Sequence, residues 1–298
     1  MNQATETTTD TPLLPKWAEL SLSRPFLLEV FVLANLFFLI LDVYLAHSFN
    51  DFAHWAEWIP VYFSIGGTAV LGFAIWQEYQ RRTGQARWIG LAVGWASILV
   101  GLAGLVWHLD GWFFESVTLK SLVYSAPFVA PLAFAGLGCL LLLNRMEDPD
   151  SPAWGQWVSF LALGGFVGNF VLSLIDHAQN AFFYWTEWIP VVVSALAVGL
   201  FGAIILRPPT RLVILVGYGV LLLQGATGLL GFGLHVAPLF REGALERGLW
   251  DALRFGAPVF APLLFVDLAL LGRWGCGTST PSSPTSPPEG TGPLERDA

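Results

Sequence analysis

Two stretches of this chain, 130 residues apart, carry nearly the same sequence. Residues 47–60 read HSFNDFAHWAEWIP and residues 177–190 read HAQNAFFYWTEWIP, so that eight of fourteen aligned positions are identical without a gap. A second match, at an offset of 131 residues, pairs 126–134 with 257–265 and repeats the pattern Ala-Pro-x-x-Ala-Pro. Fusion of two related units explains both matches. The fold must therefore accommodate two related halves, and the residues that both halves share point to the function.

The composition is that of a membrane protein. The chain is 55% apolar and only 12% charged, about half the charged fraction of a typical soluble domain. Eight apolar segments have close to the roughly 20 residues that a helix needs to cross a bilayer. They are Phe26–Ala46, Trp58–Trp76, Trp88–Trp107, Leu122–Leu143, Trp154–Ile175, Trp188–Leu206, Leu212–Leu234 and Phe255–Leu271. Because a spanning segment must satisfy its own backbone polar groups, we expect an all-α integral membrane protein with eight transmembrane helices.

The repeat also predicts how the helices are arranged. Each copy holds four segments, an even number, so both copies insert in the same direction and form two parallel four-helix repeats. The predicted divisions are an N-terminal tail (1–24), a first repeat (25–146), a second repeat (147–274) and a disordered tail rich in Ser, Thr, Pro and Gly (275–298).

The basic residues predict the orientation. With the N-terminus inside, the inner segments hold ten Lys and Arg residues and the outer loops hold four. This asymmetry predicts that the N- and C-termini are both cytoplasmic. The membrane is expected to be the cell inner or plasma membrane. The expected partner is the lipid bilayer, and no nucleic-acid partner is expected.

Histidine and glutamate recur at equivalent positions near the predicted outer face. Each half has one histidine at the end of its first helix and one at the end of its third, and it has one glutamate at the start of its second helix. These residues are His47, His108 and Glu57 in the first half, and His177, His235 and Glu187 in the second. Glycines lie four and seven residues before both third-helix histidines, on the same helix face.

Two kinds of cofactor fit this pattern. The pairs His47–His108 and His177–His235 are predicted axial ligands of haem b, because two histidines on neighbouring helices can hold a haem, with the glycines leaving a flat slot. Alternatively, each pair and its glutamate form a transition-metal site. The first half also has His54 and Asp51, which favours acid–base work or metal capture there. The catalytic candidates are Glu57, Glu187, His54 and Asp51.

These features also have structural explanations. Glycines allow close helix packing in membranes, and a glutamate is stabilised near a helix N-terminus. Four polar residues lie within the predicted spans: Glu29, Asn169, Gln224 and Asp267. Asp267 is the most costly of them and should face the bundle interior or a wet cavity. Prolines at 127, 131, 258 and 262 should bend the fourth and eighth helices near the two sites.

The layout resembles that of haem A synthase. That family also has two four-helix halves, paired histidines near the outer face and a glutamate beside one pair. It places its histidines on even-numbered helices, whereas the histidines here fall on odd-numbered ones. Its Glu-x-x-His spacing is also not met, because Pro60 and Pro190 stand three residues after Glu57 and Glu187. The resemblance is one of layout and does not extend to membership.

Three functional hypotheses follow. The leading one is a membrane protein with two pseudo-equivalent haem b sites for electron transfer or quinol chemistry, which would make it a membrane oxidoreductase with a quinone or a redox protein as partner. The second is capture or transport of copper, zinc or iron. The third is a non-catalytic membrane subunit or a carrier of lipophilic molecules.

Overall fold

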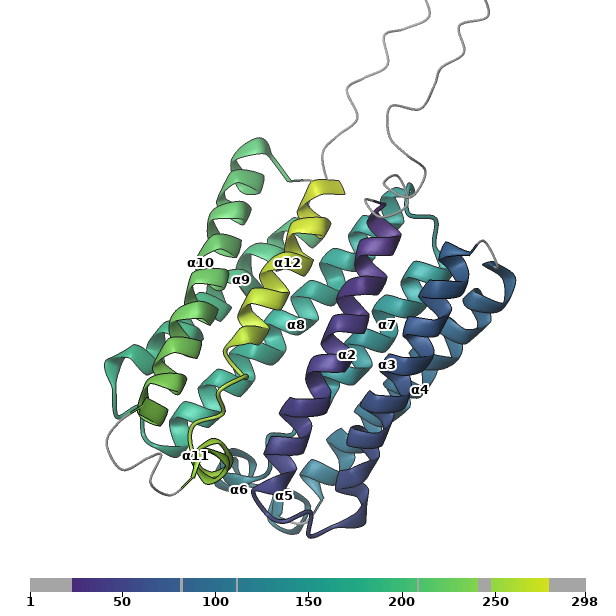
Figure 1. Cartoon of the computed structure of the whole chain (residues 1–298). Helices are drawn as coiled ribbons and strands as arrows, with labels where there is room; N and C mark the ends of the chain where they lie inside the picture. The colour runs from purple at the N-terminus through teal and green to yellow at the C-terminus, as the bar shows by residue number, and fades with distance from the viewer. Residues whose placement is uncertain (1–22, 81–82, 111, 208, 241–247, 279–298) are drawn as a thin grey trace, which may run out of the picture.

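The computed structural model describes residues 23–80, 83–110, 112–207, 209–240 and 248–278, and within these ranges it contains helices and no strand (Figure 1). Six helices are long and apolar enough to cross a membrane. They are α2 (Arg24–Ser48), α3 (Trp58–Tyr79), α4 (Thr83–Leu109), α8 (Pro152–Gln179), α9 (Trp188–Leu206) and α10 (Arg211–Val236). The prediction of an all-helical, multi-pass membrane protein is confirmed for these residues.

Local sequence signals set where several helices begin. Pro25 and Pro152 stand in the first turns of α2 and α8, where a missing backbone N–H costs nothing. The Ser151 hydroxyl accepts a hydrogen bond from the Trp154 N–H at 3.2 Å, and Thr210 caps α10 in the same way through the Val213 N–H. Each half therefore carries its own helix start signals.

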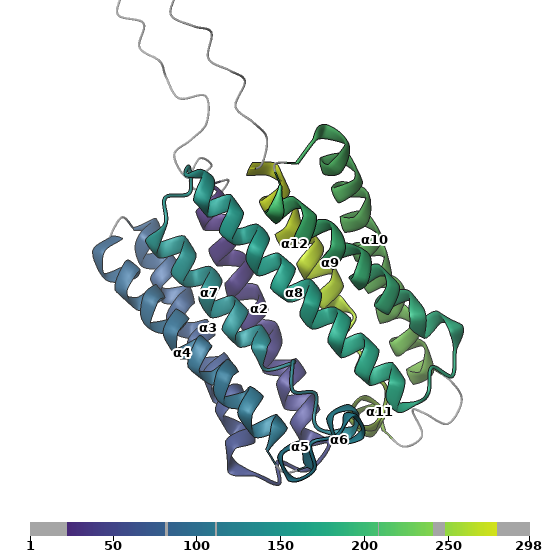
Figure 2. The ribbon, with the colours of Figure 1, turned by 180° about the vertical axis from the view of Figure 1, so that it is seen from behind.

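The helices pack as two groups with the same order. In the first group, α2, α3, α4 and α7 (Leu132–Met146) each contact the next, and α7 closes the ring on α2. In the second group, α8, α9, α10 and α12 (Leu263–Thr278) repeat this pattern. Figures 1 and 2 show the two groups side by side from opposite directions.

The boundary between the groups is apolar. Helices α7 and α8 contact each other there. On the other side, the Phe31 and Trp274 rings lie 5.7 Å apart, and the Phe38 and Phe260 rings 5.0 Å apart. Aromatic side chains of α2 thus pack against the last part of the second group, so the two halves share one core.

Two predicted helices are not continuous. In place of Leu122–Leu143 the chain forms α6 (Leu119–Tyr124), an irregular stretch and then α7. In place of Phe255–Leu271 it forms α11 (Leu249–Phe255), a second irregular stretch and then α12. Each irregular stretch holds two prolines four residues apart, and each proline removes an N–H and disfavours helical geometry at the residue before it. The prolines therefore interrupt these helices instead of bending them.

The C-terminal boundary also differs from the prediction. Helix α12 continues through residues 275–278, which the sequence analysis assigned to the tail. The other residues of the predicted tails, 1–22 and 279–298, lie outside the described part of the chain.

The paired glycines face the irregular stretches. A Cβ on Gly101 would lie 2.8 Å from the Pro131 carbonyl oxygen, and a Cβ on Gly228 would lie 2.8 Å from that of Pro262. Gly104 and Gly231 face the same two prolines. The expected flat slot beside the histidines is therefore wrong, since proline fills it. The glycine spacing shows which residues share a face but not what lies against that face.

Close packing at Gly101 gives a stability prediction. Gly101→Ala should destabilise the protein by about 1–3 kcal/mol, because the new methyl group meets backbone atoms that cannot rotate away. Gly136→Ala on α7 is the control, since nothing lies within 4 Å of a Cβ built there. Thermal unfolding in detergent, followed by circular dichroism, measures both. Equal midpoints for the two variants would show that α4 and α7 are not in close contact.

Candidate functional site

Helices α2 and α4 bring His47 and His108 together. Both helices end at the same end of the first group, and the two imidazole ring centres are 6.0 Å apart with their planes at 84°. The side chain of His47 is only 19% exposed. Two imidazoles from different helices thus face each other in a largely enclosed position.

The His108 ring forms a hydrogen bond through its Nδ1, and the His47 Nδ1 has a carboxylate nearby. The His108 Nδ1 lies 3.1 Å from the backbone carbonyl oxygen of Pro127. Because a carbonyl oxygen only accepts hydrogen bonds, this Nδ1 carries the proton and the Nε2 keeps its lone pair. The His47 Nδ1 lies 3.7 Å from the Glu57 Oε2, and the carboxylate favours the same tautomer.

The loop between α2 and α3 brings Glu57 to this position. Glu57 stands at the N-cap of α3, yet its side chain makes no capping hydrogen bond. Instead, the Asn50 Nδ2 donates to the Glu57 Oε1 at 2.9 Å. The helix-capping explanation for this glutamate is therefore not what the structure shows.

The same loop is strained. Asp51 and Phe52 have φ angles of 59° and 53°, values that cost a non-glycine residue about 1–3 kcal/mol. Stacking of the Phe52 ring on Trp58, with centres 4.0 Å apart, accompanies this turn. Phe52 also contacts His47, with ring centres 6.2 Å apart. The strained turn thus lines one side of the histidine.

The second group repeats the arrangement. The His177 Nδ1 lies 3.9 Å from the Glu187 Oε2, and the His235 Nδ1 lies 2.9 Å from the Pro258 carbonyl oxygen. The amide of Asn180 forms a hydrogen bond with Glu187. The φ angles of Ala181 and Phe182 are 58° and 52°, and the Phe182 and Trp188 rings stack with centres 3.9 Å apart. Both repeats therefore share the histidine–glutamate and histidine–carbonyl contacts and the strained turn with its stacked rings.

The sequence analysis missed four residues of these sites. Asn50 and Phe52, with their counterparts Asn180 and Phe182, were not predicted to take part. All four lie at positions that are identical in the two repeats. That identity was the available signal, but the side-chain types suggested no ligand chemistry.

His54 and Asp51 lie apart from the first pair. The exposed His54 ring accepts a hydrogen bond from the Ala56 N–H at 3.3 Å and so caps the short helix η1 (Trp55–Glu57). The Asp51 side chain is 84% exposed and forms an ion pair with Arg254. Neither side chain has a hydrogen bond, ion pair or ring contact with His47 or His108.

The metal hypothesis gains no geometric support. Among the residues that the structure describes, no group of three or more His, Cys, Asp and Glu is placed to hold a metal ion. In each half the glutamate lies beside the Nδ1 of a histidine, where it orients the ring.

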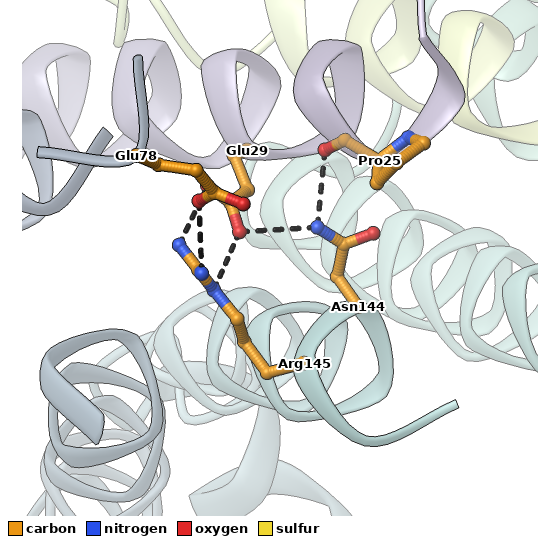
Figure 3. A network of polar contacts seen from close by, with 5 residues as sticks. All are labelled: Pro25, Glu29, Glu78, Asn144 and Arg145. Atoms are coloured by element: carbon orange, nitrogen blue, oxygen red, sulfur yellow. Dashed lines mark hydrogen bonds and ion pairs between the residues drawn. The ribbon is translucent and has the colours of Figure 1, made fainter. Parts of the chain in front are cut away.

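A second polar cluster lies at the opposite end of the first group (Figure 3). Arg145 of α7 pairs with the buried Glu29 at 2.8 Å and with Glu78 at 2.9 Å. The Asn144 Nδ2 donates to Glu29 at 3.1 Å and to the Pro25 carbonyl at 3.0 Å. A cavity of about 380 Å³ lies beside this cluster. Glu29, one of the polar residues within the predicted spans, is buried.

Among its described residues, the second repeat shows no equivalent of this cluster. The residues equivalent to Glu29, Asn144 and Arg145 are Ser159, Gly275 and Cys276. A Cβ on Gly275 would lie 2.4 Å from the Ser159 Oγ, so α8 and α12 approach closely at the same place. The charged cluster is therefore not a requirement of this four-helix arrangement.

Removing Arg145 should destabilise the first repeat. Arg145→Leu leaves the Glu29 carboxylate buried without its cation, which costs about 3–5 kcal/mol. Replacing both residues by leucine should recover most of that loss. Arg87→Leu, an exposed residue beside the same cavity, is the control. Denaturant unfolding in detergent micelles measures the stability of each variant. A double variant as unstable as Arg145→Leu alone would show that the unpaired Glu29 carboxylate is not the cause of the loss.

No protein-family model matches this chain, and no curated protein or solved structure matches it either. The functional assignment therefore rests on the geometry of the two histidine pairs.

Proposed function

We propose that this chain is a membrane electron-transfer protein that holds two haem b groups, one per repeat. His47 with His108, and His177 with His235, would hold the haem iron through their Nε2 atoms. The haem supplies reversible one-electron chemistry when bound, and the partner is a quinone or a redox protein at the outer face.

The spacing of His47 and His108 carries the proposal. Two imidazoles that share one metal ion through nitrogens about 2 Å from it have ring centres about 6 Å apart. The observed separation is 6.0 Å. The two ring planes lie at 84° to each other.

The Nδ1 contacts support the same proposal. A histidine that binds a metal through Nε2 typically donates its Nδ1–H to a carboxylate or a backbone carbonyl, which fixes the ring and makes it a better ligand. In each pair one Nδ1 bonds a backbone carbonyl, that of Pro127 or Pro258. The other Nδ1 lies near a carboxylate, Glu57 or Glu187, beyond hydrogen-bonding distance. All four Nε2 atoms remain for a ligand.

The proposed topology has eight crossings. Helices α7 and α12 each close one ring of four helices. Together with the irregular stretch before it, each would form the fourth crossing of its repeat. Irregular backbone is tolerated at membrane depth only where protein surrounds it. Pro131 and Pro262 pack against α4 and α10 and meet that requirement. Pro127 and Pro258 are exposed, and their carbonyls are bonded by His108 and His235. The two repeats then run in the same direction, with both termini cytoplasmic and both histidine pairs near the outer face.

An absorption spectrum tests the proposal. Protein purified from haem-sufficient cells should show a Soret band, and His47→Ala or His108→Ala should remove about half of the bound haem, since one of two axial pairs is lost. His54→Ala is the matched control, because this histidine lies outside the pair. A colourless protein that contains stoichiometric copper, zinc or iron would contradict the haem proposal and favour the metal-site hypothesis. Function that survives alanine at all four paired histidines would leave only the scaffold hypothesis.

The glutamates should tune affinity without binding the haem. Glu57→Ala should weaken haem binding at the first pair by about 10–100-fold, a typical effect of removing a carboxylate that orients a ligating histidine. Asn50→Ala should have a smaller effect in the same direction, because Asn50 holds Glu57. Haem titration of the apoprotein measures both. Unchanged affinity in Glu57→Ala would remove the orienting role.

A further inference from the structure

The short helices α6 and α11 each touch both repeats. Both lie at the histidine end of the molecule, near the boundary of the two groups (Figures 1 and 2). By sequence α11 belongs to the second repeat, but it contacts α2 of the first. Likewise α6 belongs to the first repeat and contacts α8 of the second. The helices that carry His47 and His177 are therefore each contacted by a segment of the other repeat.

The contact of α11 with the first repeat is specific. Arg254, only 15% exposed, forms an ion pair with Asp51, four residues after His47. The Phe255 ring lies 5.7 Å from Phe49, and the Trp250 ring lies 5.9 Å from Tyr44. These contacts hold α11 against the end of α2 and the strained turn that follows it.

The same segment continues directly to the second histidine pair. Helix α11 ends at Phe255, and three residues later the Pro258 carbonyl accepts the hydrogen bond of His235. Five residues, Arg254 to Pro258, thus connect the turn beside His47 with a proposed ligand of the second haem.

The first repeat mirrors this connection. The Gln179 Nε2, two residues after His177, donates to the Val123 carbonyl of α6 at 2.9 Å. Four residues later the Pro127 carbonyl meets the His108 Nδ1. A residue near His47 thus contacts the segment whose carbonyl bonds His235, and a residue near His177 contacts the segment whose carbonyl bonds His108.

We propose that Asp51 with Arg254, and Gln179 through Val123, are positioning contacts that couple the two histidine pairs. Asp51 and Arg254 hold the Pro258 carbonyl in place for His235, and Gln179 holds the Pro127 carbonyl in place for His108. Each contact therefore strengthens ligand binding at the pair in the opposite repeat. The proposal deepens the proposed function and rests on it for its binding measurement.

The test isolates one pair at a time. In protein carrying His47→Ala and His108→Ala, only His177 and His235 can bind haem. Adding Asp51→Asn should raise the dissociation constant of that remaining pair about fivefold or more, within the usual range of coupling between sites. Asparagine tolerates the positive φ of this position, so the turn itself is kept. Glu115→Gln on α5 (Trp112–Glu115) is the control, because it removes the same charge from an exposed side chain.

The reciprocal measurement uses the other pair. In protein carrying His177→Ala and His235→Ala, Gln179→Leu should weaken binding at His47 and His108 by a similar factor. A merely structural role of Asp51 or Gln179 predicts equal losses at both pairs, or none, and either result would overturn the coupling.

A readout without haem separates the two proposals. Amide hydrogen exchange of the purified protein reports on Gly256, Ala257 and Val259, which surround the Pro258 carbonyl. Asp51→Asn should speed exchange there, and Glu115→Gln should not. If no variant binds haem but Asp51→Asn speeds this exchange, the proposed function fails and the positioning contact stands. If haem binds and both affinity and exchange are unchanged, the coupling fails and the haem proposal stands.

Discussion

The irregular stretches before α7 and α12 each accept a hydrogen bond from a histidine, and the Pro127 carbonyl also accepts one from the Ala130 N–H. In a membrane each unpaired backbone carbonyl is costly, and two prolines four residues apart leave a stretch of chain that cannot complete a helical ladder. His108 and His235 donate to the Pro127 and Pro258 carbonyls. One interaction therefore stabilises the break in the helix and also fixes the tautomer of a proposed ligand. The glycines of α4 and α10 serve the same arrangement, because they let Pro131 and Pro262 pack against these helices.

The two repeats share their histidine ends and differ at the opposite ends. Both keep the histidine pair, the glutamate, its asparagine partner and the strained turn with its stacked rings. Only the first repeat has the buried group of Glu29, Arg145 and Asn144, and the second has small residues in close contact at that place. Since replacing a buried ion pair by well-packed neutral residues is often neutral or stabilising, the charged group is not needed to hold such a bundle together. The common feature of the two repeats is the histidine end, and this is why the proposed function is placed there.

The exchange of short helices makes the two sites parts of one structure. If each repeat were an independent bundle, α11 would pack on its own first helix and the Arg254–Asp51 pair would not form. Instead, α11 touches α2 and α6 touches α8. The boundary between the repeats therefore includes, besides α7, α8 and the aromatic contacts of α2, the segments that bond His108 and His235.

The sequence alone determined the class of the protein and the identity of its candidate ligands. Apolar length and low charge predicted membrane-spanning helices, and the internal repeat singled out His47, Glu57 and their counterparts, because these signals depend only on the order of residues. It could not show that Leu122–Leu143 and Phe255–Leu271 are broken, since apolar length is the same whether prolines bend a helix or interrupt it. It also could not show that Pro131 fills the space beside Gly104, or that Asp51 turns to Arg254 two hundred residues away in the chain. Those outcomes were decided by the tertiary structure, because they depend on which surfaces of distant segments meet and which carbonyls are left for a histidine to bind.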